Sequence, residues 1–341
     1  MPNAYISGTG FFVPDNVVTN DDLRDVYGIE TSDEWIRKRT GIAERRFAPQ
    51  GMGTADMGAK AAEMAIEAAG IDKKDLGMII LATLSPDHVF PGSGVLVQRQ
   101  LGMADTGNFV PCLDVRNQCS GFLYALGTAA SMVQSGNTNH VLVIGSETHS
   151  HALDLSSRGR TVASLFGDGA GAVVVSATEE DRGLRNYTLG ADGRFAETLW
   201  QPMWDIRNFP FLPQDEDGNG IVAPEMMWAS MDGRQVFRNA VEKMITSLMK
   251  VCWEEKVDTK DIDLFLFHQA NLRINEYVQK QLNIPDDKVF NNIMRYGNTT
   301  AGTIPILMAE AEREGILKPG MKVGLAAFGS GFTWGAALLD W

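Results

Sequence analysis

The segment IDKKDLGMIILA, residues 71–82, recurs without a gap in the second half of the chain as VDTKDIDLFLFH, residues 257–268. Three of the positions are identical, and most of the others exchange one apolar residue for another. Each copy ends in a run of aliphatic or aromatic residues, which is typical of a buried strand. A match between segments this far apart predicts that one structural unit occurs twice in the fold.

A second pair of segments keeps the same order in the two halves. GDGAGAVVV at 167–175 matches GFTWGAALL at 331–339, at an offset of 164 residues. We therefore interpret the chain as an internal duplication, in which residues 1–178 form one half and residues 179–341 the other.

Strand-like and helix-like runs alternate along the whole chain. The strand-like runs are MIILATL (78–84), VLVIGS (141–146), GAVVVSA (171–177), LFLFHQ (264–269) and VGLAAFG (323–329). The helix-like runs, rich in alanine and amphipathic in pattern, are residues 56–70, 120–136, 233–255 and 298–315. This alternation predicts an α/β fold whose sheets are buried on both faces.

The bulk composition narrows the classes of function. The chain has 341 residues, 44% of them hydrophobic, and a formal net charge of −13. Nucleic acid and anionic membranes require a basic face, so we expect neither as a partner. No apolar run approaches the ~20 residues of a membrane helix, and the first residues do not predict a secretory signal.

The cysteines indicate a compartment and one candidate nucleophile. Cys112, Cys119 and Cys252 are odd in number and scattered, which is typical of a cytoplasmic protein without a disulfide framework. Cys119 lies in DVRNQCSGFLYALG (114–127), where an extended run gives way to a helix of small residues. Unpaired N–H groups and the helix dipole favour the reactive thiolate at such a position.

The duplication predicts two partners for this cysteine. Cys119 to Gly136 and Asn298 to Gly315 each span 17 residues, from a helix start to a terminal glycine. Cys119 and Asn298 are therefore expected at equivalent helix N-termini, which approach each other if the halves pack about a pseudo-two-fold axis. His268 ends a repeated strand, and open α/β sheets bind their ligands at strand ends.

These three residue types suit acyl transfer. A thiolate at Cys119 can take an acyl group from a thioester, which divides one difficult transfer into two easier ones. The Nε2–H of His268 and the amide of Asn298 can donate to a carbonyl oxygen on which negative charge develops. The histidines are dispersed, no metal is expected, and THSHALD (148–154) is interpreted as a surface loop.

Other interpretations of the same residues stay open at this point. Cys119 alone fits an inert buried thiol, His268 a satisfied strand-end histidine and Asn298 a helix N-cap. A papain-like protease has Cys, His and Asn in this order, with His ~130–150 residues after Cys. Here the separation is 149 residues, but the local sequence NQCSGF differs from that of the protease. A catalytically inactive binding protein is a third possibility.

Several motifs together carry a resemblance to a known family. They are TSDEWIRKRTGIAER, the cysteine segment, FGDGAGAVV, HQANLRI, YGNTTAGTIP and FGSGFTWGAAL. Over essentially its full length the chain resembles β-ketoacyl-acyl-carrier-protein synthase III, the condensing enzyme that starts bacterial fatty-acid synthesis. The resemblance implies a thiolase-like five-layer αβαβα fold, a homodimer and no cofactor. It also implies that an acyl-CoA and malonyl-acyl carrier protein are condensed with loss of CoA and CO2.

The resemblance implies catalytic roles for particular residues. Cys119 would be the acylated nucleophile. His268 and Asn298 would hold the malonyl thioester carbonyl while CO2 leaves. The backbone N–H groups of Cys119 and Ser330 would form the oxyanion hole for acyl transfer.

The resemblance also implies a site for coenzyme A. Trp35 and Arg158 would hold the adenine between them, and Arg39 would contact the nucleotide phosphates. Asn271 and Gly233 would contact the pantetheine arm. An aromatic ring with a guanidinium plane is a suitable clamp for a base.

The acidic carrier protein requires local positive charge on an acidic enzyme. Arg234 and Arg238 are one helical turn apart, Lys243 follows on the same predicted helix, and Arg273 follows the catalytic strand. We interpret these residues as a docking patch for acyl carrier protein. The alternative is an ordinary solvated helix face.

Residues 200–228 are longer than the usual connection in the family and rich in tryptophan, phenylalanine and proline. Within them, DEDGNG (215–220) resembles part of a calcium loop but is interpreted as a polar turn. We expect the segment to border the acyl pocket and alter which primer is accepted. Phe90 matches the residue that lines this pocket from across the family's dimer.

One enzyme alternative remains within the same fold. A condensing enzyme of secondary metabolism would carry the same triad with another acceptor or a longer primer. The sequence alone determines neither the primer length nor the pathway.

Overall fold

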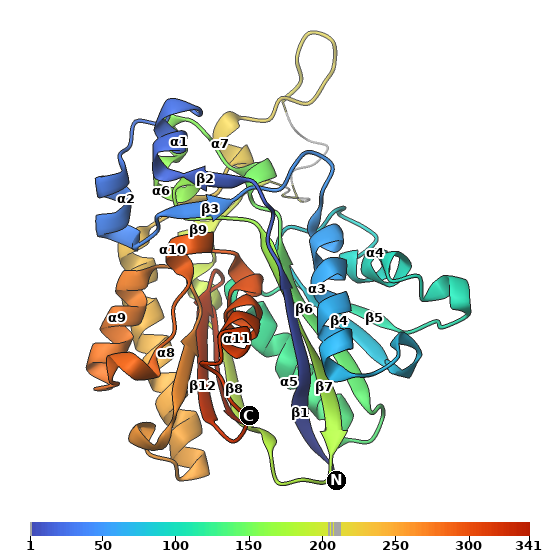
Figure 1. Cartoon of the computed structure of the whole chain (residues 1–341). Helices are drawn as coiled ribbons and strands as arrows, with labels where there is room; N and C mark the ends of the chain where they lie inside the picture. The colour runs from blue at the N-terminus through green and yellow to red at the C-terminus, as the bar shows by residue number, and fades with distance from the viewer. Residues whose placement is uncertain (1, 204, 206, 208–212) are drawn as a thin grey trace.

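The computed structural model describes residues 2–203, 205, 207 and 213–341 (Figure 1). Its strands are β1 (Asn3–Phe12), β2 (Val17–Thr19), β3 (Glu44–Arg46), β4 (Met78–Ala82), β5 (Cys112–Val115), β6 (His140–Glu147), β7 (Gly169–Thr178), β8 (Gly183–Ala191), β9 (Leu199–Trp200), β10 (Ser230–Met231), β11 (Leu264–Phe267), β12 (Lys322–Gly329) and β13 (Thr333–Asp340). Its α-helices are α1 (Asn20–Asp25), α2 (Asp33–Thr40), α3 (Thr54–Ala69), α4 (Ser93–Gln100), α5 (Gly121–Gln134), α6 (Arg160–Ala163), α7 (Pro224–Met227), α8 (Gly233–Glu255), α9 (Leu272–Gln281), α10 (Ile293–Tyr296) and α11 (Thr303–Arg313). Two short 3₁₀ turns at the site are η3 (Gln118–Ser120) and η9 (Thr300–Gly302).

Two mixed sheets repeat one pattern of strand pairing. The first has the order β1-β7-β6-β4-β5 and the second β11-β12-β13-β8. In the first sheet β7 is antiparallel to both β1 and β6, and β4 is parallel to β6. In the second, β13 is antiparallel to both β8 and β12, and β11 is parallel to β12. The change from the first sheet to the second falls between Thr178 and Gly183.

The second sheet has no full strand in the place of β5; among the described residues a single isolated bridge lies there. β5 pairs in parallel with β4, and Ile79 lies opposite Cys112. Phe265, 186 residues after Ile79, forms an isolated parallel bridge with Val289. The segment that leads to Asn298 therefore occupies the place of the strand that leads to Cys119.

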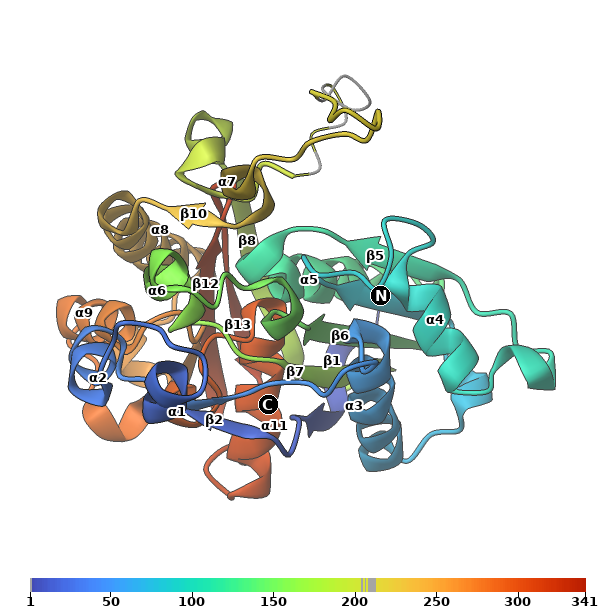
Figure 2. The same cartoon turned by 90° about the horizontal axis from the view of Figure 1, so that it is seen from above.

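The layers follow from side chains that alternate between the two faces of each strand. Ile80 and Ala82 of β4 face a central core that contains α5, α11 and strands of both sheets. Ile79 and Leu81 face the opposite core, which α3 and α4 cover. On the far side of the second sheet α8 and α9 complete the fifth layer (Figure 2).

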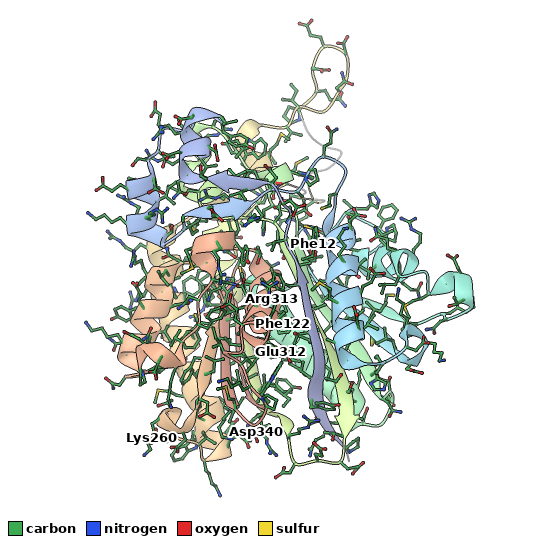
Figure 3. All side chains as sticks on the ribbon, in the orientation of Figure 1. Phe12, Phe122, Lys260, Glu312, Arg313 and Asp340 are labelled. Carbon is green, nitrogen blue, oxygen red and sulfur yellow. The ribbon has the colours of Figure 1, made fainter. Side chains whose placement is uncertain are left out.

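The central layer is a hydrophobic core that both halves share. Phe122 of α5, labelled in Figure 3, is 1% exposed and packs among residues from both halves. Truncating such a side chain costs about 3–5 kcal/mol. Within the described residues, no helix is long and apolar enough to span a bilayer.

The two helices of the central layer are each preceded by a 3₁₀ turn that starts with a left-handed residue. Gln118 and Thr300 both have left-handed backbone, with φ of 46° and 49°, although neither is glycine. Each is the first residue of a 3₁₀ turn that runs directly into α5 or α11. When Gln118 is aligned with Thr300, the counterpart of Cys119 is Ala301, and Asn298 lies three residues before it. The 17-residue spacing to the terminal glycines had paired Cys119 with Asn298 instead, because α11 is three residues shorter than α5.

Candidate active site

Cys119 is held at the junction of the two halves. It lies in η3, immediately before α5, and is 7% exposed. The end of β12 approaches it so closely that a Cβ on Gly329 would lie 2.9 Å from the Cys119 Cβ. Only glycine fits at that position without displacing the nucleophile.

The protonation state of Cys119 differs from the expectation that its helix position favours thiolate. Burial raises the pKa of the thiol to about 12, and the nearby Glu147 carboxyl acts in the same direction. Hydrogen bonds from the Thr300 side chain and from the backbone of Cys119 and Ser330 lower the pKa, but they do not outweigh burial. The thiol of the free chain is therefore protonated at neutral pH.

His268 follows β11 directly and is 2% exposed. Its Nδ1 lies 2.6 Å from the hydroxyl of Thr303, and that hydroxyl donates to the backbone oxygen of Thr300 at 3.0 Å. Because a hydroxyl has one proton, Nδ1 must be the donor to Thr303. Burial lowers the pKa of His268 to about 3, so the ring is neutral and Nε2 carries a lone pair.

The expected role of His268, donation from Nε2–H to a reacting carbonyl, therefore begins from an unprotonated Nε2. Nε2 is buried and has no hydrogen-bond partner among the described residues. It is an acceptor in the free chain and becomes a donor only after it has taken a proton.

Asn298 is fixed by its backbone and by its side chain. Its N–H donates to the Leu165 oxygen at 2.8 Å, and its own oxygen accepts from Gly167 at 3.1 Å. The side-chain Oδ1 accepts from the backbone N–H of Thr300 at 2.8 Å. With Oδ1 occupied, Nδ2 is the end of the amide that can donate to a bound group.

One cavity collects the predicted triad. Cys119, His268 and Asn298 all line a hollow of about 120 Å³. Asn271 and Gly233 line the same hollow, as the resemblance implied for a pantetheine arm. The remaining walls are mainly apolar: Leu165, Phe166, Leu199, Met231, Val236, Phe237, Ala240, Met244, Ala270, Ile274, Phe328 and Gly329.

A second cavity, of about 340 Å³, is also lined by Cys119. Ser330 lines it, as do the first residues of the long connection, Trp200, Gln201 and Met203. The nucleophile therefore lines both a narrow, mainly apolar cavity and a larger chamber.

The sequence interpretation of 148–154 as a surface loop is wrong for His149. This side chain is 7% exposed and lines the second cavity, and its ring centroid lies 4.5 Å from that of Phe166 at an interplanar angle of 38°. Its Nε2 lies 2.6 Å from the Thr300 hydroxyl. The signal available in the sequence was its position at the end of VLVIGS, since strand ends in this fold point at the site.

Glu147 is a second residue that the sequence analysis did not identify. It is fully buried at the end of β6 and accepts hydrogen bonds from the backbone N–H groups of Leu84 and Ser85 and from the Thr83 hydroxyl. Burial raises its pKa to about 7 despite these bonds. Glu147 thus joins the ends of β4 and β6 beneath the nucleophile.

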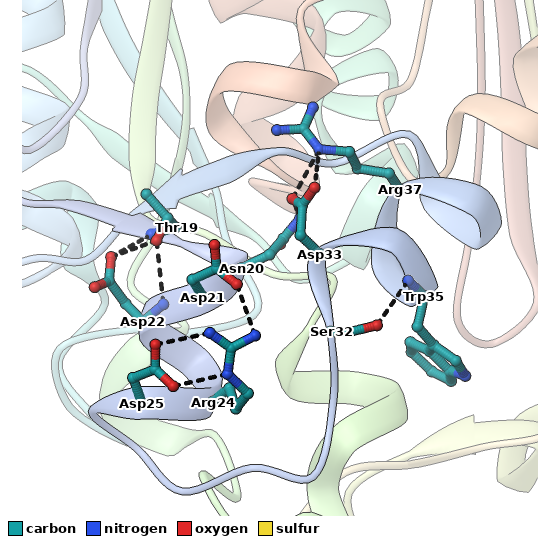
Figure 4. A network of polar contacts seen from close by, with 10 residues as sticks. All are labelled: Thr19, Asn20, Asp21, Asp22, Arg24, Asp25, Ser32, Asp33, Trp35 and Arg37. Atoms are coloured by element: carbon teal, nitrogen blue, oxygen red, sulfur yellow. Dashed lines mark hydrogen bonds and ion pairs between the residues drawn. The ribbon is translucent and has the colours of Figure 1, made fainter.

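The predicted adenine clamp has a different cation from the expected one. Trp35 lies in the first turn of α2, where its backbone N–H donates to the Ser32 hydroxyl at 3.1 Å (Figure 4). The guanidinium groups of Arg39 and Arg160 lie 4.2 and 4.8 Å from its ring centroid. Arg158 instead forms an ion pair with Asp154 at 2.6 Å. The structure therefore brings Arg160, not Arg158, to Trp35.

The basic residues of the predicted docking patch differ from one another. Arg234 and Arg238 are exposed at the start of α8 and form no ion pair with any described residue. Arg273 instead donates to the backbone oxygens of Lys38 and Arg37 and pairs with Glu276. Its guanidinium therefore ties α9 to the end of α2.

The long connection divides into two parts. Leu199, Trp200, Gln201 and Met203 line the second cavity, whereas residues 213–221 are exposed and extend away from the body in Figure 1. DEDGNG forms a polar turn in which Asp215 accepts from the backbone N–H groups of Asp217 and Asn219. Three of the aromatic residues that motivated the prediction, Trp204, Phe209 and Phe211, lie outside the described residues.

Phe90 lies outside both cavities of the single chain and is 84% exposed. Val89, Val95, Phe109 and Leu113 are also exposed hydrophobic residues in the region of α4 and β5.

Comparisons with known proteins identify the family. The model for the C-terminal part of 3-oxoacyl-[acyl-carrier-protein (ACP)] synthase III matches residues 252–341, and the model for 3-oxoacyl-[ACP] synthase III matches residues 113–193. The β-ketoacyl-[acyl-carrier-protein] synthase III of Clostridium acetobutylicum is 40% identical over 341 residues, which cover 100% of this chain and 99% of the relative. That of Xanthomonas campestris pv. campestris is 40% identical over 98% of this chain and 97% of the relative.

Solved structures agree with the sequence comparisons. The 3-oxoacyl-[acyl-carrier-protein] synthase III of Aquifex aeolicus VF5 superposes with a TM-score of 0.87 at 40% identity, covering 99% of this chain and 100% of that one. A priming β-ketosynthase of the R1128 polyketide pathway gives 0.88 at 28% identity, covering 99% and 96%. The expected thiolase-like fold is confirmed. The chain belongs to the 3-oxoacyl-[acyl-carrier-protein] synthase III family, the condensing acyltransferases that initiate fatty-acid synthesis.

Proposed function

We propose that this chain condenses an acyl-CoA primer with malonyl-acyl carrier protein, through an acyl group carried on Cys119. The products are a 3-oxoacyl-acyl carrier protein, CoA and CO2. The observation that carries the proposal is the single cavity that Cys119, His268 and Asn298 share. The reaction needs no cofactor in this scheme, because the CoA thioester is itself a substrate.

In the first half-reaction Cys119 attacks the primer thioester. The thiol is protonated at rest, and the unpartnered Nε2 of His268 accepts its proton as the S–C bond forms. The backbone N–H groups of Cys119 and Ser330 donate to the oxyanion. CoA leaves as a thiolate, which takes a proton from solvent, and the acyl chain extends into the second cavity.

In the second half-reaction the proton held by His268 serves as a hydrogen-bond donor. Its Nε2–H and the Nδ2 of Asn298 donate to the malonyl thioester oxygen while CO2 leaves. The enolate carbon attacks the acyl carbonyl on Cys119, and the C–S bond breaks. The cysteine sulfur then takes back the proton from Nε2, so that one proton from solvent is consumed per turnover.

The CoA nucleotide is assigned to the surface beside α2. The Trp35 ring and the Arg160 guanidinium would clamp the adenine, and Arg39 would meet the phosphates. The contacts of both cations with the ring support this assignment. Asn271 and Gly233 would line the path of the pantetheine arm, which the first cavity supports.

The carrier protein is assigned to Arg234 and Arg238, whose guanidinium groups are free of ion pairs among the described residues. Reversing both charges should raise KM for malonyl-acyl carrier protein and leave KM for malonyl-CoA unchanged. Lys260→Glu is a matched control, because Lys260 is exposed beyond the opposite end of the 23-residue helix α8 (Figure 3). An equal rise in both KM values would reject the docking assignment.

Two further features are proposed on family grounds. A homodimer would place Phe90 of the partner subunit at the acyl chamber, which the exposed hydrophobic residues around β5 support. A cytoplasmic location agrees with three free cysteines.

A second candidate is the priming step of a polyketide pathway, with a primer other than acetyl. The likeness to the R1128 priming β-ketosynthase and the chamber bordered by residues 199–203 favour it. One assay separates the two. Wild-type protein is incubated with acyl-CoA thioesters of increasing length, the adduct on Cys119 is weighed by mass spectrometry, and malonyl-acyl carrier protein is then added. No adduct with any thioester would reject both candidates.

A further inference from the structure

Among the arginines that the structure describes, only Arg45 in β3 is completely buried. No ion pair of the described residues includes its guanidinium, and its Nε has no hydrogen-bond partner among them. Burial lowers its pKa to about 10, so the side chain is still a cation at neutral pH. A buried charge without a counterion is costly, and an apolar side chain would fill the same space at lower cost. Packing alone therefore does not explain why a guanidinium lies here.

The guanidinium of Arg45 donates to three acceptors on separate segments. Nη1 donates to the Val18 oxygen at 3.2 Å, and Nη2 donates to the Asn20 Oδ1 at 2.8 Å. Nη2 also donates to the backbone oxygen of Ser164 at 2.9 Å. Val18 and Asn20 belong to β2 and the start of α1, whereas Ser164 lies 119 residues further along the chain than Arg45. The third bond therefore joins β3 to the segment that leads into β7.

That segment, residues 164–167, holds the backbone of Asn298. The Leu165 oxygen accepts from the N–H of Asn298 at 2.8 Å, and the N–H of Gly167 donates to the Asn298 oxygen at 3.1 Å. Phe166 and Asn298 thus form an isolated parallel bridge between the two halves of the chain. Leu165, Phe166 and Asn298 all line the first cavity, so this bridge is part of the wall of the active site.

The aliphatic stem of Arg45 packs against both chains of the bridge. A Cβ on Gly167 would lie 3.0 Å from the Arg45 Cβ, and a Cβ on Gly297 would lie 3.3 Å from it. One of these glycines is on each chain of the bridge, so neither chain can carry a side chain between itself and Arg45 without displacement. The guanidinium, in turn, fixes the Ser164 oxygen one residue before the first hydrogen bond of the bridge.

We propose that Arg45 is a positioning residue for the condensation step, because its buried side chain fixes the segment to which the Asn298 backbone is hydrogen-bonded. The inference deepens the proposed function and rests on Asn298 as a donor to the malonyl thioester oxygen. Arg45 lines neither cavity and acts only through the Ser164 oxygen and the bridge. Without it the Asn298 amide shifts relative to the malonyl carbonyl, whereas Cys119, which η3 and the end of β12 hold, stays in place.

The test measures the two half-reactions separately in the full-length protein. Release of CoA from an acyl-CoA primer reports acylation of Cys119, and product formation after malonyl-acyl carrier protein is added to the acylated protein reports condensation. Arg45→Met keeps an apolar stem and removes every donor of the guanidinium. We expect acylation at a near-normal rate and condensation about 10²-fold slower, because misplacement by ~1 Å has that effect.

Two comparisons separate positioning from a loss of stability. Ile66→Ala leaves a cavity in the outer core beside α3, so it should lower the melting temperature without changing the ratio of the two rates. In Arg45→Met/Asn298→Ala, condensation should be no slower than in Asn298→Ala alone, because both changes remove one interaction. All variants are assayed below their melting transitions. Losses that multiply in the double variant would reject the inference.

A conservative variant grades the effect. Arg45→Lys keeps a buried cation that can donate to the Ser164 oxygen, but it lacks the planar fork that also reaches Asn20. It should recover part of the condensation rate that Arg45→Met loses. If Arg45→Met does not fold, Arg45→Lys decides. Slower condensation with normal acylation supports the role of Arg45, and an unchanged ratio of the two rates rejects it.

Failure of the proposed function would look different from failure of this inference. If no thioester acylates wild-type Cys119, the proposed function fails, and the role of Arg45 fails with it. If the wild type completes both steps and folded Arg45→Met keeps the wild-type ratio of the two rates, only the role of Arg45 is overturned.

Discussion

At the scale of single residues, burial favours the neutral form of each titratable group around Cys119. Burial raises the pKa of the thiol to about 12 and that of Glu147 to about 7, and it lowers the pKa of His268 to about 3. A dry site of this kind avoids the cost of isolated buried charge. Charge then develops only when substrate brings the carbonyl that will carry it.

The two donors of the condensation step should be separable by mutation. Asn298→Ala removes the Nδ2 donor to the malonyl carbonyl and the Oδ1 acceptor of the Thr300 N–H. Neither atom meets the primer in the proposed mechanism, so we expect Cys119 to be acylated at a near-normal rate while condensation falls about 10²–10³-fold. His268→Ala also removes the acceptor of the thiol proton, so both steps should slow. Stopped-flow release of CoA reports the first step and product formation the second. Identical profiles for the two variants would refute the division of roles.

Glu147 should make stability depend on pH in a defined window. Its pKa in the folded chain, about 7, is raised above its ordinary value of 4.5, chiefly by burial. The stability it contributes is fully present below pH 4.5 and is lost as the pH rises to about 7, in total ~3 kcal/mol. Glu147→Gln cannot ionise and should lack this component.

Urea unfolding of both proteins at several pH values between 5 and 8 measures the effect. The free energy of unfolding of the wild type, relative to Glu147→Gln, should fall as the pH rises. A difference that stays constant, or grows with pH, would show that the carboxyl is already ionised in the folded chain.

At the scale of elements, the end of β12 and the start of α5 depend on each other. A Cβ at Gly329 would lie 2.9 Å from both the Cβ and the N of Cys119, so Gly329→Ala must displace the nucleophile or the strand end. We expect acylation to slow about 10²-fold, because misplacement by ~1 Å has that effect. The melting temperature should fall, since overpacking costs about 1–3 kcal/mol. Gly193→Ala is the matched control, because nothing lies within 4 Å of its added Cβ.

The elements themselves were largely predictable because each obeys one periodic pattern. The predicted helix 233–255 has the same bounds as α8, and the strand-like runs overlap β4, β6, β7, β11 and β12. The pairing of Cys119 with Asn298 was a register error of three residues. It arose because the left-handed Gln118 and Thr300 have no compositional signature, unlike the glycines that usually adopt such φ values.

The site was predictable where roles depend on residue type and position in a motif. Cys119, His268 and Asn298 do meet in one cavity. The sequence did not reveal the roles of His149 and Arg160 because tertiary packing determines them. His149 lies in a segment with a loop-like sequence but is buried, and Arg160 rather than Arg158 contacts the Trp35 ring. Burial also reversed the expected pKa direction of Cys119, and a sequence gives no measure of burial at that precision.

At the scale of the whole molecule, the first sheet has an open edge. Within the part of the chain that the structure describes, β5 pairs with β4 alone, and its Leu113 is 37% exposed. An exposed apolar strand edge is a liability unless another chain covers it. At the corresponding place in the second sheet, the described residues form only the bridge between Phe265 and Val289. The two halves therefore differ in the strand edge that they expose to a partner chain.

Leu113→Asp should therefore separate a homodimer into monomers. A charge in an interface of the usual ~1,200–2,000 Å² is buried without a partner, and the cost is several kcal/mol. Light scattering after size exclusion measures the mass, and Val26→Asp is the control, since Val26 is 69% exposed at the end of α1 and away from β5. Because Phe90 of the partner subunit would then leave the acyl chamber, acylation of Cys119 should weaken in parallel with dimer loss. A monomeric variant that acylates at the wild-type rate would mean that one chain completes the chamber alone.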